Sequence, residues 1–211
     1  MENRLLVEVN KDFNFIYDKN KIETLEWDRV DITKESQGDE KRPDSIQYHI
    51  ISLLKQKNYD IIFDDDSSGE AADIITIRVE NEQIFIEFYH CKYSKKSVAG
   101  ARVDDLYEVC GQAQKSIQWK ENPKKLIEHM IYRERSKYSS KNVSRFEIGD
   151  NKKLVSIKRM LNYYKCHLHI FIVQPGVSKA KITDDQLQLL AATENYLMET
   201  YKIKFTPIFS K

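Results

Sequence analysis

The segment at residues 84–93, IFIEFYHCKY, constrains the fold more than any other part of the chain. Apolar residues occupy both alternating sets of positions, so a strand made from this segment would be apolar on both faces. Such a strand is typical of the centre of a sheet, because burial of both faces requires a layer of the protein on each side. We therefore predict that residues 84–93 form a central strand.

The remaining pattern predicts strands and helices around that strand. Two alternating runs, 4–9 and 13–27, predict a short β-hairpin or meander, and the polar segment 28–43 indicates a linker. We expect a small N-terminal β appendage with its linker over residues 1–43, and one main domain over residues 44–211. In that domain the pattern favours an α/β fold with a mixed central β-sheet flanked by helices. The further strands are expected at 59–63, 71–79, 145–148, 167–174 and 204–209, and the helices at 45–57, 103–119, 123–136, 154–164 and 183–201.

Composition excludes several classes of protein. The chain of 211 residues has no run of about 18 apolar residues, which a membrane-spanning helix needs, and its start, MENRLLVEVN, lacks the apolar stretch of a signal peptide. Cys91, Cys110 and Cys166 are widely spaced and form no CxxC pair, so neither a disulfide framework nor a structural zinc site is indicated. We expect a cytoplasmic protein without a membrane partner.

Charge is distributed unevenly, although 34 basic and 33 acidic residues leave a formal net charge of only +1. Residues 1–88 carry 11 basic and 21 acidic side chains, whereas residues 89–165 carry 18 basic and 8 acidic ones. A basic part of this kind can bind a polyanion such as nucleic acid even in a neutral protein. The alternative is that the two parts neutralise each other on a mixed surface.

Three residues on neighbouring predicted strands have the spacing of a site for phosphodiester hydrolysis. Asp73 lies on one strand, and His90 and Lys92 end the next, where a spacing of two puts them on the same face. A carboxylate and an imidazole can hold a divalent cation, which polarises a phosphate and lowers the pKa of a bound water. A lysine beside them can stabilise the negative charge of the phosphate or help to deprotonate the water.

This segment resembles the PD-(D/E)xK, or restriction-endonuclease-like, nuclease superfamily. The resemblance rests on the helix at 45–57 and on GEAAD (69–73), IEFYHCKYS (86–94) and LYEVCGQAQKS (106–116), and it covers residues 44–175. It is nearest in kind to nuclease modules of bacterial restriction and defence proteins. It implies a restriction-endonuclease-like αβββαβ core, Mg²⁺ or Mn²⁺ as cofactor, Asp73 as first metal ligand, Lys92 as motif lysine and the backbone carbonyl of Cys91 as a further ligand.

The chain departs from the family motif at the second acidic position, where His90 stands two residues before Lys92. Neutral imidazole binds metal without adding negative charge. Glu87 is the alternative ligand, although simple alternation points it to the opposite face unless a bulge intervenes. We predict Asp73, His90 and Lys92 as catalytic residues, rank His90 above Glu87 as the second ligand, and keep both.

Further candidates for contacts with substrate lie on the turn before the motif, the loop after it and the following helix. They are Glu70, Lys95, Lys96, Arg102, Gln112, Gln114 and Lys115. For the helix residues the alternative is an ordinary polar face, and Glu70 either faces the metal or is simply solvated. Gln47 stands where family members sometimes carry a helical acid, although we favour a solvated helix position for it. The run Asp64–Asp66 could supply metal oxygens, but we interpret it as a solvated turn.

Together these features predict a metal-dependent endonuclease that hydrolyses phosphodiester bonds, in DNA, within a bacterial restriction or anti-phage defence system. DNA is the expected partner, and a helicase or other defence subunit and a second copy of the chain are further possible partners. The alternative is a catalytically inactive nuclease-fold module that binds nucleic acid or a partner protein. The histidine at position 90 is the reason to keep that alternative.

Overall fold

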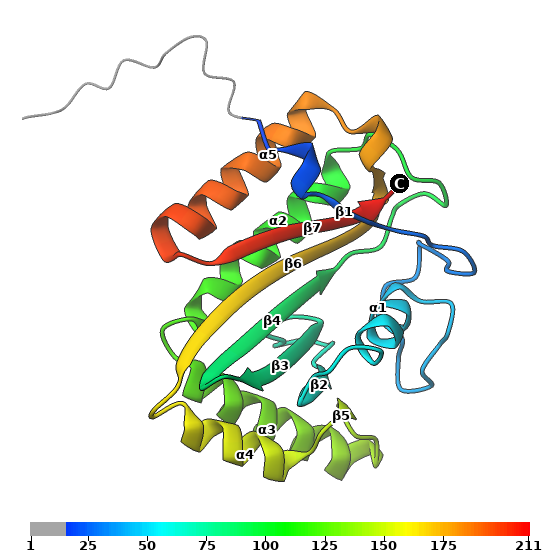
Figure 1. Cartoon of the computed structure of the whole chain (residues 1–211). Helices are drawn as coiled ribbons and strands as arrows, with labels where there is room; N and C mark the ends of the chain where they lie inside the picture. The colour runs from blue at the N-terminus through cyan, green and yellow to red at the C-terminus, as the bar shows by residue number, and fades with distance from the viewer. Residues whose placement is uncertain (1–15) are drawn as a thin grey trace, which may run out of the picture.

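Strand β4 (Gln83–Cys91) is the centre from which the sheet extends in both directions. The computed structural model describes residues 16–211, and in them a seven-stranded mixed sheet has the order β1-β7-β6-β4-β3-β2-β5. From β4 to the β1 edge the neighbours are parallel, and from β4 to the β5 edge they are antiparallel. Five helices flank the sheet (Figure 1). The predicted α/β fold with a mixed central sheet is confirmed.

The elements follow the expected order along the chain. The other strands are β1 (Glu23–Leu25), β2 (Ile61–Asp64), β3 (Ile74–Glu80), β5 (Phe146–Ile148), β6 (Lys165–Ser178) and β7 (Lys204–Ser210). The helices are α1 (Ile46–Leu54), α2 (Asp104–Lys115), α3 (Pro123–Lys141), α4 (Asn151–Met160) and α5 (Asp184–Asn195). A short 3₁₀ helix, Ser116–Trp119, continues α2.

The residues of β4 explain its central place. Ile84, Ile86 and Phe88 enter one buried cluster, while Tyr89 and Cys91 enter the cluster on the opposite face. Alternate residues of a strand point to opposite faces, so both faces of β4 are covered by the protein. The two-residue turn of Asn81 (φ 49°) and Glu82 (φ 59°) joins β3 to β4, and two left-handed residues suit the twist of a tight hairpin.

The helices form unequal layers on the two faces (Figure 1). Helix α1 packs its apolar residues with Tyr89 and Cys91 on one face. Helices α2, α3, α4 and α5 contribute to the cluster on the other face. Ser45 caps α1 by accepting the N–H of Tyr48 at 3.3 Å, and Thr183 and Gln186 form a capping box at α5, so the expected starts of these two helices are confirmed. Helix α4 begins three residues earlier than expected, at Asn151.

The first part of the expected β-hairpin falls on residues 1–15 and lies outside the described residues. Within residues 16–27 the structure has a short 3₁₀ turn and β1, which pairs in parallel with β7 at the edge of the main sheet. The segment at 28–43 runs back beside α1, where Glu35 accepts the N–H of Gln47 at 3.0 Å. Tyr17 and Ile22 are buried in the main core. The domain boundary at residue 43 stays a prediction.

Strand β6 is longer than its sequence predicts, because we expected Pro175 and Gly176 to end it. The ladder with β7 is interrupted between Gln174 and Ser178, and the proline, which has no N–H to donate, falls in that interruption. The strand itself continues to Ser178, where it pairs with β7 again through Ser210. No helix among residues 16–211 has the length and apolar character needed to cross a membrane.

Candidate metal centre

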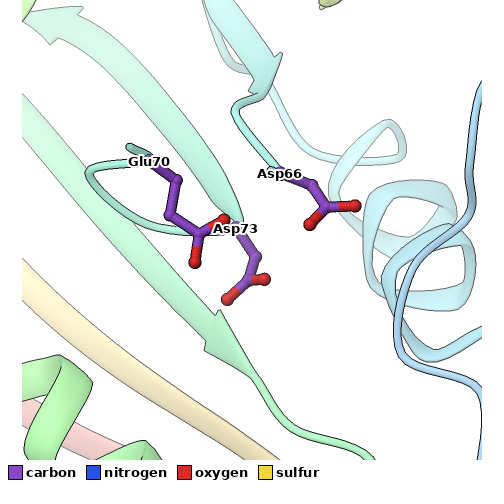
Figure 2. Close-up of side chains that lie close together, drawn as sticks. All are labelled: Asp66, Glu70 and Asp73. Atoms are coloured by element: carbon purple, nitrogen blue, oxygen red, sulfur yellow. The ribbon is translucent and has the colours of Figure 1, made fainter. Parts of the chain in front are cut away.

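Three carboxylates from a single loop gather near the end of β4. Asp66 follows β2, Glu70 lies in the loop and Asp73 immediately precedes β3. Each contributes an oxygen, and these oxygens all lie within 4.8 Å of one another. Figure 2 shows the three side chains grouped beside the end of the neighbouring strand. Carboxylate oxygens are the ligands that Mg²⁺ and Mn²⁺ prefer, so this acid cluster (Asp66, Glu70 and Asp73) is a possible metal-binding group.

Arg133 of α3 holds the loop that carries the acid cluster. Its guanidinium donates to the carboxylate of Asp65 and to the backbone carbonyl of Ser68, the latter at 2.8 Å. Asp65 also accepts the N–H of Ala71 at 2.8 Å, which ties the two ends of the loop together. Arg133 and Asp65 are both buried, so the charge of each depends on the other for compensation.

Arg145, just before β5, is the second arginine that holds the loop. It donates to the backbone carbonyls of Asp64 at 2.9 Å and Asp66 at 3.0 Å, and to the hydroxyl of Ser67 at 3.1 Å. Gly69 has φ of +85°, a conformation that favours glycine, and so permits the turn between Asp66 and Glu70. Hydrogen bonds from Arg133 and Arg145 to the loop therefore fix the positions of the acids. The interpretation of Asp64–Asp66 as a solvated turn is wrong, because Asp64 and Asp65 are buried.

Asp73 is the deepest member of the acid cluster, with 1% of its surface exposed. Its carboxylate accepts the backbone N–H of Cys91 at 2.9 Å and the side-chain amide of Gln47 at 3.1 Å. The bond from the Cys91 N–H joins the start of β3 to the end of β4. The sequence analysis predicted the catalytic residues at these two strand ends. Gln47 on α1 therefore contacts the predicted first metal ligand.

The pKa values of two members of the acid cluster, Asp73 and Glu70, are raised. Burial raises the pKa of Asp73 well above its usual value, and the charges of Glu70, Glu35 and Asp66 raise it further, against the Cys91 N–H bond. Burial also raises the pKa of Glu70, with Asp66 and Asp65 adding to the effect and the Ser67 N–H opposing it. A bound divalent cation would compensate this repulsion and favour the ionised carboxylates.

The raised pKa values predict how stability depends on pH in the absence of metal. Above about pH 4 the folded protein retains protons on Asp73 and Glu70 that the unfolded chain has released. The contribution of these two carboxyl groups to the stability of the fold is therefore complete below about pH 4, and it is lost as pH rises through their folded-state pKa values. Glu70→Gln removes one acid and keeps an acceptor for Ser67. We expect the variant to gain stability relative to wild type as pH rises from about 4 to 7, so that its free energy of unfolding increases relative to that of wild type.

Denaturant unfolding in EDTA at several pH values measures this difference. Glu121→Gln, at an exposed position before α3, is the matched control and should show a difference that does not change with pH. If the difference in free energy of unfolding between Glu70→Gln and wild type is also the same at every pH in this range, the predicted repulsion within the acid cluster is contradicted.

Lys92 lies beyond the end of β4 and pairs with two glutamates. Its ammonium group lies 2.8 Å from a carboxylate oxygen of Glu108 on α2 and 3.5 Å from one of Glu35. Burial lowers the pKa of Lys92, but the hydrogen bond to Glu108 and the charge of Glu35 outweigh this and raise it above its usual value. Lys92 is therefore a fixed positive charge. The negative charge of Glu35 also raises the pKa of Asp73, so Glu35 interacts with both Lys92 and the acid cluster.

His90 and Glu87 both lie outside the acid cluster. The Nε2 atom of His90 is 2.8 Å from the hydroxyl of Ser116, and burial lowers the pKa of this imidazole to about 3, so the ring is neutral. The carboxylate of Glu87 accepts three hydroxyl groups, from Tyr59 at 2.7 Å, Tyr89 at 2.8 Å and Thr76 at 3.1 Å. The structure therefore does not bring either candidate second ligand together with Asp66, Glu70 and Asp73.

The other candidate residues divide into three groups. Gln112 and Lys115 line a cavity beside the acid cluster together with Glu70. Gln114 instead faces α5, where its amide is 3.4 Å from the hydroxyl of Thr193. The remaining residues lie on the loop after β4: Lys95 and Lys96, which are exposed, and Arg102, which donates to Asp105 at 3.1 Å and to Ser94 at 2.7 Å.

The sequence analysis considered Asp66 as a source of metal oxygens but preferred a solvated turn, and it did not single out Glu35. Asp66 sits at the end of an acidic run after a short strand, a signal that suits a turn as well as a ligand. Glu35 lies in the polar segment at 28–43, where no periodicity marks it. Its carboxylate accepts the N–H of Tyr93 at 2.9 Å, a contact between residues 58 positions apart.

The acid cluster and the adjacent cavity form a possible binding site for a divalent cation. The acids offer oxygen ligands, and Lys92, the predicted motif lysine, pairs with Glu35 and Glu108. Comparison of this chain with family models, with curated proteins and with solved structures found no match.

Proposed function

We propose that this protein is a metal-dependent endonuclease that hydrolyses phosphodiester bonds in DNA. The observation that carries the proposal is the acid cluster, in which three carboxylates converge within 4.8 Å although Asp73 is almost fully buried. Bringing like charges together in a buried place costs free energy unless a counter-charge is bound. Mg²⁺ or Mn²⁺ is the counter-charge that suits oxygen ligands.

The order of the elements supports a PD-(D/E)xK type of nuclease. Helix α1, strands β2, β3 and β4 and helix α2 follow one another in the order that the resemblance implies, and β6 comes after the intervening α3, β5 and α4. Asp73 at the start of β3 and Lys92 at the end of β4 occupy the two ends of the motif. In this proposal Asp66 and Glu70 supply the acidic ligands that the histidine at position 90 does not.

Each residue then has a stated part in the reaction. The metal, when bound, would supply Lewis-acid activation of the phosphate and of a water. Asp66, Glu70 and Asp73 would hold it, and the Cys91 N–H and Gln47 amide would orient Asp73. Lys92 has a raised pKa and keeps its proton at neutral pH, so it would stabilise charge on the phosphate rather than act as a base.

Basic side chains at the adjacent cavity and on the loop after Lys92 support a polyanionic substrate. Lys115 lines the adjacent cavity, and Lys95 and Lys96 are exposed on the loop that follows Lys92. Contacts of this type hold phosphates without reading sequence. A bacterial restriction or anti-phage role and association with a helicase, another defence subunit or a second copy of the chain remain part of the proposal.

Metal binding gives the direct test of the acid cluster. At about 100 times its Kd, Mn²⁺ should stabilise the wild-type protein by about 2.7 kcal/mol and raise Tm by about 5–10 °C. Glu70→Gln removes one proposed ligand, and a hundredfold loss of affinity would reduce this shift to about 1 °C at the same concentration. Thermal unfolding with and without Mn²⁺ measures both, with Glu121→Gln as the control that should keep the full shift.

Cleavage of plasmid and oligonucleotide DNA with Mg²⁺ or Mn²⁺ tests the reaction itself. Metal-dependent cleavage by wild-type protein that is lost in Glu70→Gln supports the endonuclease. A metal shift without cleavage, together with DNA binding, would favour the inactive binding module instead. No shift and no cleavage would overturn the proposal.

A further inference from the structure

A cavity of about 430 Å³ lies at the end of the sheet where strands β4, β6 and β7 begin (Figure 1). The acid cluster lies near the other end of β4. Phe85 lines this cavity and stands six positions before Cys91, a separation of about 20 Å along a strand. The volume lies within the range of about 300–1,000 Å³ that is usual for pockets that take a small molecule. The cavity is therefore separate from the proposed metal centre.

The side chains that line this cavity carry an excess of positive charge. Within residues 16–211 five of them are basic and one, Glu87, is acidic, which leaves an excess of four positive charges. The carboxylate of Glu87 already accepts three hydroxyl groups from its neighbours. A concave site lined by one sign of charge attracts ions of the opposite sign. The basic residues that define this basic cavity are Arg78, Lys120, Lys165, Lys202 and Lys204.

The positive charges of the basic cavity are poorly compensated by the protein itself. Arg78 and Lys202 each have one acidic partner, at 3.5 Å and 3.4 Å, in exposed pairs of the kind that contribute little. The other three lysines form no ion pair with any of residues 16–211. Burial lowers the pKa of His167, and the charges of Lys165 and Lys204 lower it further, so both ammonium groups act at this one imidazole. An anionic ligand would supply the missing negative charge.

Half-buried apolar and aromatic side chains form the rest of the basic cavity. Phe85 stands between Arg78 and His167 in the sheet, because β4 pairs with β3 on one side and with β6 on the other. The Phe85 and His167 rings stack with their centroids 5.2 Å apart, and the Arg78 guanidinium lies 5.3 Å from the Phe85 centroid. Cys166 and Leu168 add further partly accessible apolar surface. A ligand with an organic body beside its anionic groups can use both kinds of surface.

We propose that the basic cavity binds a nucleoside polyphosphate, with its phosphate groups at Lys165 and Lys204 and its base against the apolar side chains. A triphosphate carries about four negative charges at neutral pH, which matches the excess positive charge of the lining. The limited volume favours a single nucleotide over a nucleic-acid strand, because a strand needs a groove that follows its backbone. The site would give the protein a nucleotide ligand in addition to any nucleic acid at the acid cluster.

Fluorescence anisotropy of N-methylanthraniloyl-ATP, titrated with the full chain in EDTA, tests this proposal. EDTA removes divalent cations, so a metal at the acid cluster cannot hold the phosphates. We expect saturable binding. Unlabelled ATP should displace the probe at concentrations at least about tenfold lower than inorganic tripolyphosphate, which has the same number of phosphates but no base. Adenosine, which has the base but no phosphate, should displace it far less than ATP.

Substitution of the lysines locates the bound nucleotide. Lys165→Gln and Lys204→Gln each remove one positive charge from the basic cavity, and each should weaken ATP binding about tenfold. Both lysines are exposed, so the variants should fold, and circular dichroism checks this. Lys152→Gln, at an exposed position on α4, is the matched control and should bind ATP like wild type.

Three results would overturn the nucleotide site. They are the absence of saturable binding, binding that neither Lys165→Gln nor Lys204→Gln weakens, and tripolyphosphate or a 12-nucleotide single strand that displaces the probe as well as ATP does. The first two reject the basic cavity as the site, and the third shows a site for anions or for nucleic acid instead of a nucleotide.

Nucleotide binding at the basic cavity does not depend on the proposed endonuclease activity, and the experiments separate the two. ATP binding that depends on both lysines, without any Mn²⁺ shift or DNA cleavage, would support the nucleotide site and reject the endonuclease. Metal-dependent cleavage without ATP binding would support the endonuclease and reject the nucleotide site.

Discussion

Replacing Asp73 with asparagine is expected to reduce metal-dependent DNA cleavage by at least about 100-fold, because the change removes a charge that the proposed metal and the transition state need. Asparagine is nearly the same size and still offers an oxygen to the N–H of Cys91, so the fold should be retained. Initial rates of plasmid nicking with Mg²⁺ measure the effect, and circular dichroism checks folding. The Mn²⁺ thermal shift should fall in parallel.

Two further variants, Asp150→Asn and Lys92→Met, are compared with Asp73→Asn in the same assays. Asp150→Asn replaces the cap of α4, a position where asparagine serves as well as aspartate, and it should cleave like wild type. Lys92→Met removes the fixed positive charge and should lose cleavage while it keeps the Mn²⁺ shift, since Lys92 is not a proposed ligand. If Asp73→Asn and Lys92→Met both cut DNA at the wild-type rate, these residues have no part in the reaction.

Arg133→Met is expected to destabilise the protein by about 3–5 kcal/mol, because it leaves the buried carboxylate of Asp65 without its cation. For a chain of this size that corresponds to a fall in Tm of roughly 6–20 °C. Methionine fills much of the space of the arginine stem, so the main loss is electrostatic. Thermal or urea unfolding measures it.

Arg135→Met, two residues further along α3, is the matched control. Arg135 is exposed, and its replacement should change the free energy of unfolding by less than about 0.5 kcal/mol. A similar stability in both variants would show that the guanidinium of Arg133 does not hold the loop.

The sequence allowed the sheet and its helices to be predicted because their signals are local. The two apolar faces of β4, the Asn81–Glu82 turn and the Ser45 cap are each readable within a few neighbouring residues. Strand β6 shows the limit of this reasoning, since Pro175 ends a regular ladder but not the strand.

The candidate site was harder to predict because it depends on contacts between distant residues. Asp73 and Lys92 follow from the spacing on adjacent strands, but the position of Asp66 depends on Arg133 and Arg145. The orientation of His90 depends on Ser116, a neighbour 26 residues away. Period-two alternation placed His90 on a face of the strand, and it could not reveal which group on that face the imidazole would meet.

The two arginines that hold the loop after β2 also determine when the site can assemble. A ribosome releases the acids at positions 66, 70 and 73 long before it releases Arg133 and Arg145, and domains acquire their native contacts as the chain emerges. Until both guanidinium groups have arrived, Asp65 lacks its arginine partner and the carbonyls of Asp64 and Asp66 lack the donors from Arg145. A nascent chain of this protein is therefore expected to lack its cation-binding geometry until most of its length has been synthesised.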